Sequence, residues 1–537
     1  MTNGLGLGDA YGVMLDRVKG QDGEKSRLGM ATLMWISHWE RPLNADELCH
    51  ALAVEIGSPH LNSDNVPSIG TVLTCCQGLV TVDKGASTVR LIHYTLQEYL
   101  RAHLELFGTA HATMAETCLS YLNSHRVKAL SIHSSLPPQG VPFLKYSSQY
   151  WGVHAKRELS DCAKSLALKL FEDYSNHISS KILMRRQDLC WYPIRYGKVS
   201  PFSGLHCALV FGIVEIVASL VEVEGCDITQ INCADNMPLV WAAMNGHEGV
   251  VGMLLGRHDT NPNQSGTDGK TPLDYAAGNG HEGVVKMLLG RHDINPDNPN
   301  IFGQTPLYYA VLRGQEGVVE MLLRRDDVSP DRADGNGKTP LQCAAKYGHE
   351  GVVKLLLGRD EVNPNKPDVY GQTLLFDAAG SGHEGVVKIL LERHDIDPEK
   401  PNIYGQTPLH RAGSRGHQGV VKMLLGRHDI NPDKPNIFGQ TPLYSAALHG
   451  QGGVVKILLG QDSINFDKAD NGGRTPLQCA ARCGREGVVK LLLGRDDVNP
   501  ERLDNDGRTP LWWAVRNGHA GVVVLLQPPE SVTPIPA

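Results

Sequence analysis

Aromatic side chains, paired cysteines and long apolar runs are all scarce in this chain of 537 residues. Aromatic residues make up 6%, and the twelve cysteines contain no Cys-x-x-Cys pair, so the disulfide framework of a small secreted domain is not indicated. The longest nearly uncharged apolar run, 207–221, is interrupted by Glu215 and is shorter than the roughly 20 residues of a membrane-spanning helix. The first nine residues lack the basic and apolar regions of a signal peptide. We therefore expect a cytoplasmic protein, with the nucleus as the alternative.

Signs of catalytic or cofactor chemistry are also missing. Gly-Lys-Thr occurs at 269–271 and 337–339, but a phosphate-binding loop needs a glycine five residues before the first of these residues, and Gln264 and Arg332 stand there. His-Glu at 281–282 begins like a zinc-protease motif, but Val285 occupies the place of the second histidine. The recurring Arg-His-Asp sequence offers no closed set of four ligands. We expect no enzymatic activity, no cofactor and no metal site.

The charge and glycine content limit the remaining classes. The formal net charge is −7, which argues against a chain built mainly to coat nucleic acid. Hydrophobic residues make up 41% and charged residues 20%, an ordinary globular composition. Glycine is abundant, 58 of 537 residues, which indicates many turns that need a positive φ.

A period of 34 residues organises the second half of the chain. Such a period is typical of a solenoid, in which each unit buries its apolar face against its neighbours. Ten units follow one another without a change of spacing. Thr-Pro-Leu marks seven of them, and related tripeptides mark the other three: 271, 305, 339, 407, 441, 475 and 509 for Thr-Pro-Leu, with 203, 237 and 373 for the variants.

One unit shows the local structure that the others share. Thr305 is a good N-cap and Pro306 suits the first helical position, so a short helix is predicted to begin there. Gly314 can end that helix in the left-handed conformation. Val318, Val319, Leu322 and Leu323 recur at helical spacing and predict a second helix. The Pro-, Asp-, Asn- and Gly-rich stretch that follows is predicted to form a turn or β-hairpin finger.

These units resemble the ankyrin repeat. The resemblance is carried by Thr-Pro-Leu-His-x-Ala, complete at 407–412, followed by Gly-His and then Val-Val-x-x-Leu-Leu, and it covers about 203–527. It implies helix pairs with a concave face on which protein partners dock. Most units place a glycine early in the second helix, as at Gly317 and Gly351, and each should cost roughly 1 kcal/mol against alanine. We therefore expect an array somewhat softer than an idealised one.

A second order of repetition lies above the first. Residues 280–308 match 416–444 at 27 of 29 positions, an offset of 136 residues or four units. Thr-Pro-Leu-Gln-Cys-Ala-Ala at 339 recurs at 475 with the same offset. A block of four units has therefore been duplicated within the chain.

The N-terminal region has a different pattern. Helices are predicted over 25–40, 44–54 and 66–77, with Asn44 and Glu47 forming a capping box, and two β-like runs, 79–83 and 89–93, are joined by a hairpin at 84–87. Three helices followed by a hairpin is a winged-helix order. The candidate recognition helix contains no Lys or Arg, so DNA binding is not favoured.

This region resembles the winged helix that follows the nucleotide-binding domain in fungal NACHT-type signal ATPases, a family in which ankyrin arrays are common. The resemblance is carried by Arg41-Pro42-Leu43 with Glu47-Leu48, by 78–83 and by 89–99. The whole chain is thus expected to be mainly α: an ankyrin-repeat α-solenoid with β-hairpin fingers, preceded by a winged-helix-like domain and a helical connector. We expect these parts: an N-terminal segment 1–24, a winged-helix-like domain 25–125, a helical connector 126–200, the ankyrin array 201–527 and a disordered tail 528–537.

The finger row is the candidate binding surface. Three residues before each Thr-Pro-Leu, four of five successive units carry an aromatic residue with an aliphatic neighbour, and only Asn336 interrupts the series. Either these side chains pack between fingers, or they form an exposed apolar ledge for a protein partner. Cationic and polar residues at the ends of the first helices lie behind the row. The candidate protein-binding residues are Ile301, Phe302, Arg313, Lys346, Tyr347, Val369, Tyr370, Ile403, Tyr404, Arg415, Ile437, Phe438 and His449.

The sequence favours a non-enzymatic protein-interaction or scaffold module, the sensing or partner-binding arm of a fungal signalling protein. Two alternatives stay open: the C-terminal fragment of an ATP-driven NACHT-type sensor whose ATPase lies upstream, and a transcription regulator. We expect a protein partner on the concave ankyrin face, and neither nucleic acid, membrane nor a small-molecule substrate.

Overall fold

The computed structural model describes residues 7–83, 85, 87–134, 138–185, 203–222, 237–266, 268–461 and 463–527. These residues belong to two compact units, Met1–Thr267 and Asp268–Ala537, each described by itself. Parts of several predictions lie outside the described residues: 1–6 of the N-terminal segment, positions 84 and 86 of the hairpin turn, 135–137 and 186–200 of the connector, 201–202 at the start of the array, the finger at 223–236 and the tail 528–537.

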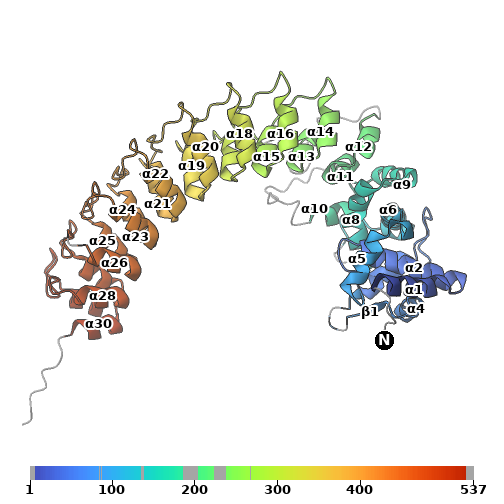
Figure 1. Cartoon of the computed structure of the whole chain (residues 1–537), viewed down its shortest axis with the longest axis horizontal. Helices are drawn as coiled ribbons and strands as arrows, with labels where there is room; N and C mark the ends of the chain where they lie inside the picture. Colours follow the sequence, from blue (N-terminus) through green and yellow to red (C-terminus); the bar gives the residue numbers. More distant parts are fainter. Residues whose placement is uncertain are drawn as a thin grey trace, which may run out of the picture. The chain divides into compact units, whose positions relative to one another are not determined.

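The first unit begins with the predicted winged helix (Figure 1). Asn44 Oδ1 accepts a hydrogen bond from Glu47 N at 2.8 Å and Glu47 Oε2 accepts one from Asn44 N at 3.0 Å, so the capping box is present. Strands β1 and β2 pair antiparallel with Val80 opposite Leu91. The elements are α1 (Leu7–Lys19), α2 (Gly23–His38), α3 (Ala45–Leu52), α4 (Ile69–Cys75), β1 (Val80–Val82), β2 (Val89–Leu91) and α5 (Tyr94–Ala102), with a short 3-10 turn at Ser63–Asn65.

Helix α1 was not predicted. It packs against α2 and α5, and the hydroxyl of Tyr11 lies 2.7 Å from Thr95 Oγ1. Tyr11, Leu15 and Val18 recur at helical spacing and are buried, so this helix extends the core of the winged helix.

A helical connector follows. It consists of η2 (Leu104–Leu106), α6 (Ala110–Asn123), α7 (His125–Lys128), α8 (Leu144–Arg157), α9 (Asp161–Phe171) and α10 (Ile178–Met184). Trp151 on α8 is fully buried, and its ring packs against those of Phe171 and Phe211 at centroid distances of 5.8 and 5.2 Å. Phe211 belongs to α11 (Gly204–Phe211), the first helix of the repeats, so α8 and α9 cover the start of the array.

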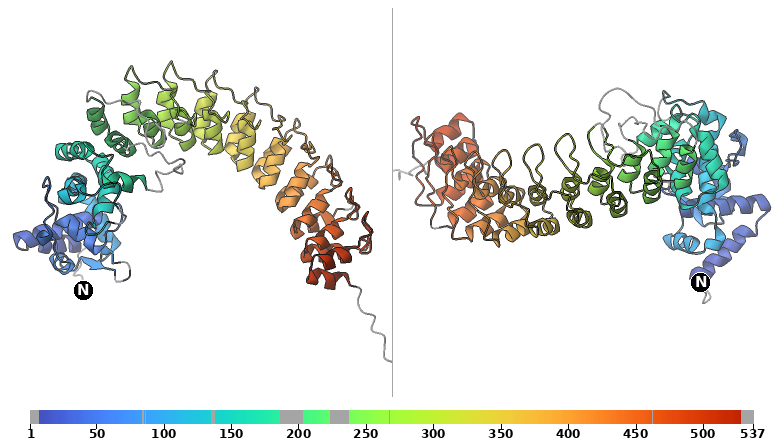
Figure 2. Two further views of the ribbon diagram at one scale, coloured as in Figure 1. Left: turned by 180° about the vertical axis from the view of Figure 1, so that it is seen from behind. Right: turned by 90° about the horizontal axis from the view of Figure 1, so that it is seen from above.

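Helix pairs repeat from α11 onward (Figures 1 and 2). First helices pack beside first helices and second helices beside second helices, which makes a two-layered stack. In the compact unit Met1–Thr267, α11 is followed by α12 (Val214–Val221), α13 (Pro238–Met244) and α14 (Glu248–Leu255). In the compact unit Asp268–Ala537, the first helix of each repeat is, in chain order, α15 (Pro272–Asn279), α17 (Pro306–Leu312), α19 (Pro340–Tyr347), α21 (Leu374–Ser381), α23 (Pro408–Arg415), α25 (Pro442–Leu448), α27 (Pro476–Arg482) and α29 (Pro510–Arg516). The second helices are α16 (Glu282–Leu289), α18 (Glu316–Leu323), α20 (Glu350–Leu357), α22 (Glu384–Leu391), α24 (Gln418–Leu425), α26 (Gly452–Leu459), α28 (Glu486–Leu493) and α30 (Ala520–Leu526).

The predicted caps are confirmed. Thr305 Oγ1 accepts a hydrogen bond from Tyr308 N, Pro306 opens α17, and Gly314 has φ +69°. Five histidines of the Gly-His pairs bond backbone, as expected: His349 Nε2 lies 3.2 Å from Leu312 O in the preceding repeat unit. The same bond recurs for His247, His383, His417 and His519. Each of these five histidines stands at the N-cap position of its own helix without making a side-chain cap bond there, and its ring joins two repeat units.

The glycines early in the second helices have a packing role that the sequence did not reveal. A Cβ built on Gly351 would lie 2.0 Å from Oε1 of Glu316, which belongs to the preceding unit. Gly317, Gly385 and Gly521 meet a preceding glutamate in the same way. At Gly487 nothing lies within 4 Å, because Gly452 stands where the glutamate would be. At most of these positions the glycine lowers the helix propensity, but its missing Cβ leaves room for a side chain of the neighbouring repeat.

The fingers are tight turns. Strand is assigned only to β1 and β2 among the described residues. Each finger closes within five residues: Asn300 N donates to Gln304 O at 2.9 Å, and Gly303 N donates to Asn300 O at 2.9 Å. The residues on either side of these turns form no strand among the described residues, so the predicted β-hairpin is present there only as its turn.

Ion pairs join successive units beside the fingers. Asp331 pairs with Lys366 at 3.0 Å, and the unit before repeats the contact between Asp297 and Arg332 at 3.0 Å. The Arg-His-Asp sequences form a second kind of ion pair, in which the arginine and the aspartate of one turn make two parallel hydrogen bonds. Arg291 Nε donates to Asp293 Oδ1 at 2.9 Å, and Arg291 Nη2 donates to Asp293 Oδ2 at 2.8 Å. These arginines and aspartates are therefore committed to the turn.

Candidate protein-binding surface

The row of finger tips exposes apolar side chains. Phe302, Tyr370, Tyr404 and Phe438 are 58%, 48%, 44% and 51% exposed. Their aliphatic neighbours are at least as exposed, at 68% for Ile301, 59% for Val369, 55% for Ile403 and 57% for Ile437. Exposed large apolar side chains that recur at one position of successive units form a continuous feature rather than scattered surface residues. We call these eight side chains the ledge.

Backbone hydrogen bonds hold the ledge in line. Ile403 N donates to Tyr370 O at 3.0 Å, and Ile437 N donates to Tyr404 O at 3.1 Å. The same bond joins Gly335 to Phe302 and Val369 to Asn336. Each finger is thus bonded to the next through the two residues that carry the ledge, so their spacing is set by the backbone.

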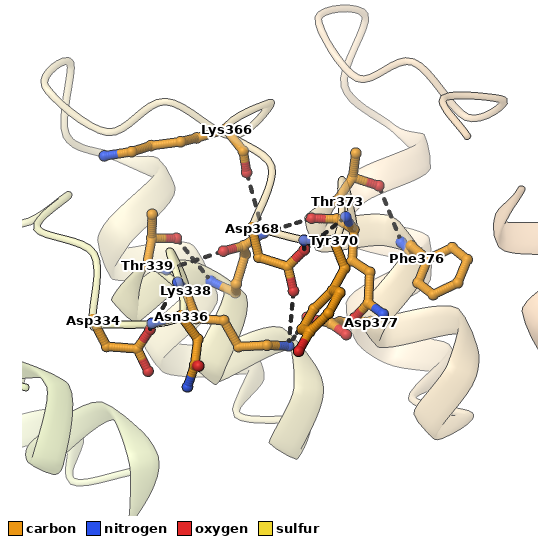
Figure 3. Close-up of polar contacts among 12 residues, drawn as sticks. Asp334, Asn336, Lys338, Thr339, Lys366, Asp368, Tyr370, Thr373, Phe376 and Asp377 are labelled. Atoms are coloured by element: carbon orange, nitrogen blue, oxygen red, sulfur yellow. Dashed lines mark hydrogen bonds and ion pairs between the residues drawn. The ribbon is translucent and has the colours of Figure 1, made fainter. Parts of the chain in front are cut away.

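Buried Asx side chains fix each tip from below. Asn402 Oδ1 accepts hydrogen bonds from Tyr404 N and Gln406 N, both at 3.0 Å. Asp368 does the same for Tyr370 and Gln372 at 2.9 and 2.8 Å (Figure 3). Both tip amides are therefore satisfied inside the finger, which orients the aromatic side chain outward.

A buried ion-pair cluster lies at the base of one finger (Figure 3). Lys338 Nζ lies 2.9 Å from Asp377 Oδ2 and 3.6 Å from Asp368 Oδ2, and both carboxylates belong to the following unit. Burial raises the pKa of Asp377, and Lys338 opposes that rise. Removing one member would leave a buried charge without compensation, so the cluster fixes the two units against each other.

The predicted cationic and polar residues lie at the other end of the first helices. Arg313, Lys346, Arg415 and His449 are exposed, and Tyr347 is 48% exposed. Lys346 Nζ lies 5.6 Å from the centroid of the Tyr347 ring. A seven-residue helix is about 10 Å long, so this second set is set back from the ledge by about that distance. The structure thus brings the thirteen residues together as two parallel rows.

A third row of side chains, which the sequence did not predict, lies on the first helices. In every repeat but the last, where Trp512 is 38% exposed, the side chain three residues after the N-cap of the first helix is buried. In several of these repeats it donates a hydrogen bond to the next finger. Gln342 Nε2 donates to Gln372 O at 2.9 Å and to Lys366 O at 3.1 Å, and His410 Nε2 lies 3.0 Å from Gln440 O. Gln478 repeats the pattern of Gln342. The signal was present as a polar residue at a 34-residue interval, but only the structure identifies the acceptors.

Asp274 occupies the position equivalent to Gln342 in its own repeat, but at high pH its carboxylate has no proton and cannot donate a hydrogen bond. Its Oδ2 accepts hydrogen bonds from Thr271 N at 2.6 Å and Thr271 Oγ1 at 2.8 Å. Its Oδ1 is buried and has no hydrogen-bond partner among the described residues. Burial raises the pKa of Asp274 to about 7, against the opposing effect of the Thr271 bonds and of Lys270.

The chemistry-bearing motifs fit structural roles. Both Gly-Lys-Thr sequences lie in fingers, and their threonines, Thr271 and Thr339, are N-caps of α15 and α19. Across the ranges that the structure describes, no group of three or more His, Cys, Asp or Glu side chains could hold a metal ion, and no helix is long and apolar enough to cross a membrane. Helix α4, the candidate recognition helix, carries no basic residue in its observed bounds.

Comparisons with known proteins agree with both resemblances. The family described as ankyrin repeats matches residues 205–300, 290–368, 360–436 and 426–502, and a single ankyrin repeat matches 506–527. The family described as the winged helix domain of GPI inositol-deacylase, a NACHT-associated type, matches residues 16–110. No curated protein matches the chain.

Proposed function

Because the chain belongs to the ankyrin-repeat family, we propose that it is a non-enzymatic interaction module whose array captures a protein partner along the ledge and the first helices behind it. One observation carries this proposal: the ledge exposes eight apolar side chains in register on a backbone that is already bonded in place. Aromatic side chains are the usual anchors of protein interfaces, and a prearranged backbone lowers the entropic cost of binding.

The rows behind the ledge support a partner that is both apolar and acidic. Arg313, Lys346 and Arg415 place positive charge along the ends of the first helices, in a chain whose overall charge is negative. Charge complementarity speeds encounter and sets orientation more than it adds affinity. The proposed concave-face site is therefore anchored by the ledge and oriented by the cations.

The winged helix favours a second level of the proposal, a role as the sensing arm of a signalling protein. Its family is NACHT-associated, which supports an arm that works with an ATP-driven engine carried upstream or by another chain. A transcription regulator has less support, because α4 carries no basic residue with which to contact phosphate.

Partner capture with the full chain tests the proposal. Wild-type protein is compared with the double variant Tyr404→Asn/Phe438→Asp, which installs the residue types found at Asn336 and Asp506. Val524→Asn is the matched control, since Val524 is 71% exposed but lies on α30, outside the ledge. We expect a partner that is retained by the wild type and the control and lost by the double variant. Equal recovery of every partner by all three proteins would overturn the proposal.

A further inference from the structure

The ledge has a repeat distance that can be bounded from the backbone. From Ile403 N to Tyr404 O the chain covers two residues, at most about 7 Å, and Tyr404 O then lies 3.1 Å from Ile437 N. Equivalent residues of adjacent fingers are therefore at most about 10 Å apart. The usual 8–10 Å between the axes of packed helices, such as α21 and α23, gives the same spacing.

Only some peptide conformations repeat at this distance. A β-strand presents same-face side chains every second residue, about 6.6 Å apart, which is too short. An α-helix returns to the same face after seven residues, about 10.5 Å, which lies just above the 8–10 Å spacing. Polyproline II returns every third residue, about 9.3 Å, which matches.

The side chains of the ledge suit the same conformation. Proline-rich segments dock on exposed aromatic side chains, and their backbone carbonyls have no internal hydrogen bonds. The hydroxyls of Tyr370 and Tyr404 make no hydrogen bond to another described residue and can donate to such carbonyls. The cations behind the ledge would pair with acidic residues between the prolines.

We infer that the ledge binds a proline-rich, acidic segment of a partner protein in the polyproline II conformation, with one anchor residue per finger. The anchors fall at positions 1, 7, 10 and 13 of the segment, facing Phe302, Tyr370, Tyr404 and Phe438, while position 4 faces Asn336. This inference names the partner's chemistry and rests on the proposed function of the ledge.

A synthetic peptide tests the inference directly. The probe is a fluorescein-labelled 13-residue peptide of the repeating sequence Pro-Glu-Ala, with proline at positions 1, 4, 7, 10 and 13, titrated with the full chain and followed by fluorescence anisotropy. The comparison peptides are a scrambled sequence of the same composition and an acidic helical peptide with leucine at every seventh residue. We expect the probe to bind wild-type protein at least tenfold more tightly than either comparison peptide does.

Variants locate the binding on the ledge. Tyr404→Asn/Phe438→Asp should weaken binding of the probe at least tenfold, Val524→Asn should leave it unchanged, and Asn336→Tyr, which completes the row, should strengthen it at least threefold. Equal binding of the probe and its scrambled form would overturn the inference. Ledge-dependent binding of the helical peptide instead would overturn the polyproline II conformation and leave the proposed function standing. If none of the three peptides binds but a whole protein is captured in a way that depends on the ledge, the polyproline II inference is likewise overturned and the proposed function still stands.

Discussion

Replacing Asp274 by glutamine should stabilise the array, and by more at high pH than at low pH. Asp274 holds the place at which Gln342, His410 and Gln478 donate to a backbone carbonyl of the next finger. An ionised carboxylate cannot donate, and Asp274 Oδ1 is buried without a partner among the described residues. Glutamine supplies the missing donor, as it does at 342 and 478.

The magnitude follows from the pKa of Asp274. Burial raises this pKa from 3.8 to about 7, so the folded protein holds the proton more tightly than the unfolded chain does. Between the two values the folded state binds more protons, and the free energy of unfolding therefore falls as the pH rises, until it levels off above about pH 7. At roughly 1.4 kcal/mol per pH unit below the folded pKa, and less near it, the loss is about 2 kcal/mol from pH 5 to pH 7 and about 3 kcal/mol from pH 5 to pH 8. The glutamine variant has no such loss.

Hydrogen exchange of the α15 peptide, corrected for the intrinsic effect of pH, measures the difference between the two proteins. We expect the stability gain of Asp274→Gln over wild type to be about 3 kcal/mol larger at pH 8 than at pH 5. Gln342→Glu is the reciprocal variant and should lose stability at pH 8 and recover part of it at pH 5. The reasoning is refuted if the gain of Asp274→Gln is the same at both pH values, because Asp274 would then not change its protonation between them.

Three further outcomes are expected. Gly487→Ala should raise the free energy of unfolding, measured by urea denaturation, by about 1 kcal/mol, because nothing crowds the new methyl group. Gly351→Ala should raise it by less, because the side chain of Glu316 must move to make room. Equal increases for the two variants would contradict the packing role of these glycines. Amides at 515–526 should exchange faster than those at 386–391, because no unit among the described residues covers the last helix pair; equal protection would contradict this. The full chain should not bind labelled ATP at micromolar concentration, and saturable binding would refute the interpretation of its Gly-Lys-Thr sequences as finger residues.

Local rules in the sequence were enough to predict most of the fold. Thr305, Pro306 and Gly314 act within a single helix, so their roles follow from the residue types alone. The capping box of Asn44 is a similar case. Helix α1 was missed because its apolar positions gain meaning only against α2 and α5, which lie elsewhere in the sequence.

Features that depend on two units could not be predicted. Gly351 is a poor helix residue when its own helix is considered, and the reason for it is the glutamate of the preceding unit. Asp274 and Gln342 fill equivalent positions, but the carbonyl oxygens that accept hydrogen bonds from Gln342 lie 24 and 30 residues further along the chain. The ledge itself was predicted as a row, while its exposure was not, since rings packed between fingers would have had the same sequence pattern.

The affinity of the full chain for its captured partner, measured together with its melting temperature, tests the central claim most directly. Burial of an aromatic anchor contributes roughly 2 kcal/mol or more to binding, so Tyr404→Asn/Phe438→Asp should raise the dissociation constant at least tenfold. Because both rings are about half exposed, the melting temperature should stay within about 2 °C of the wild-type value. An unchanged dissociation constant with a clearly lowered melting temperature would show that the rings hold the fingers together and bind nothing.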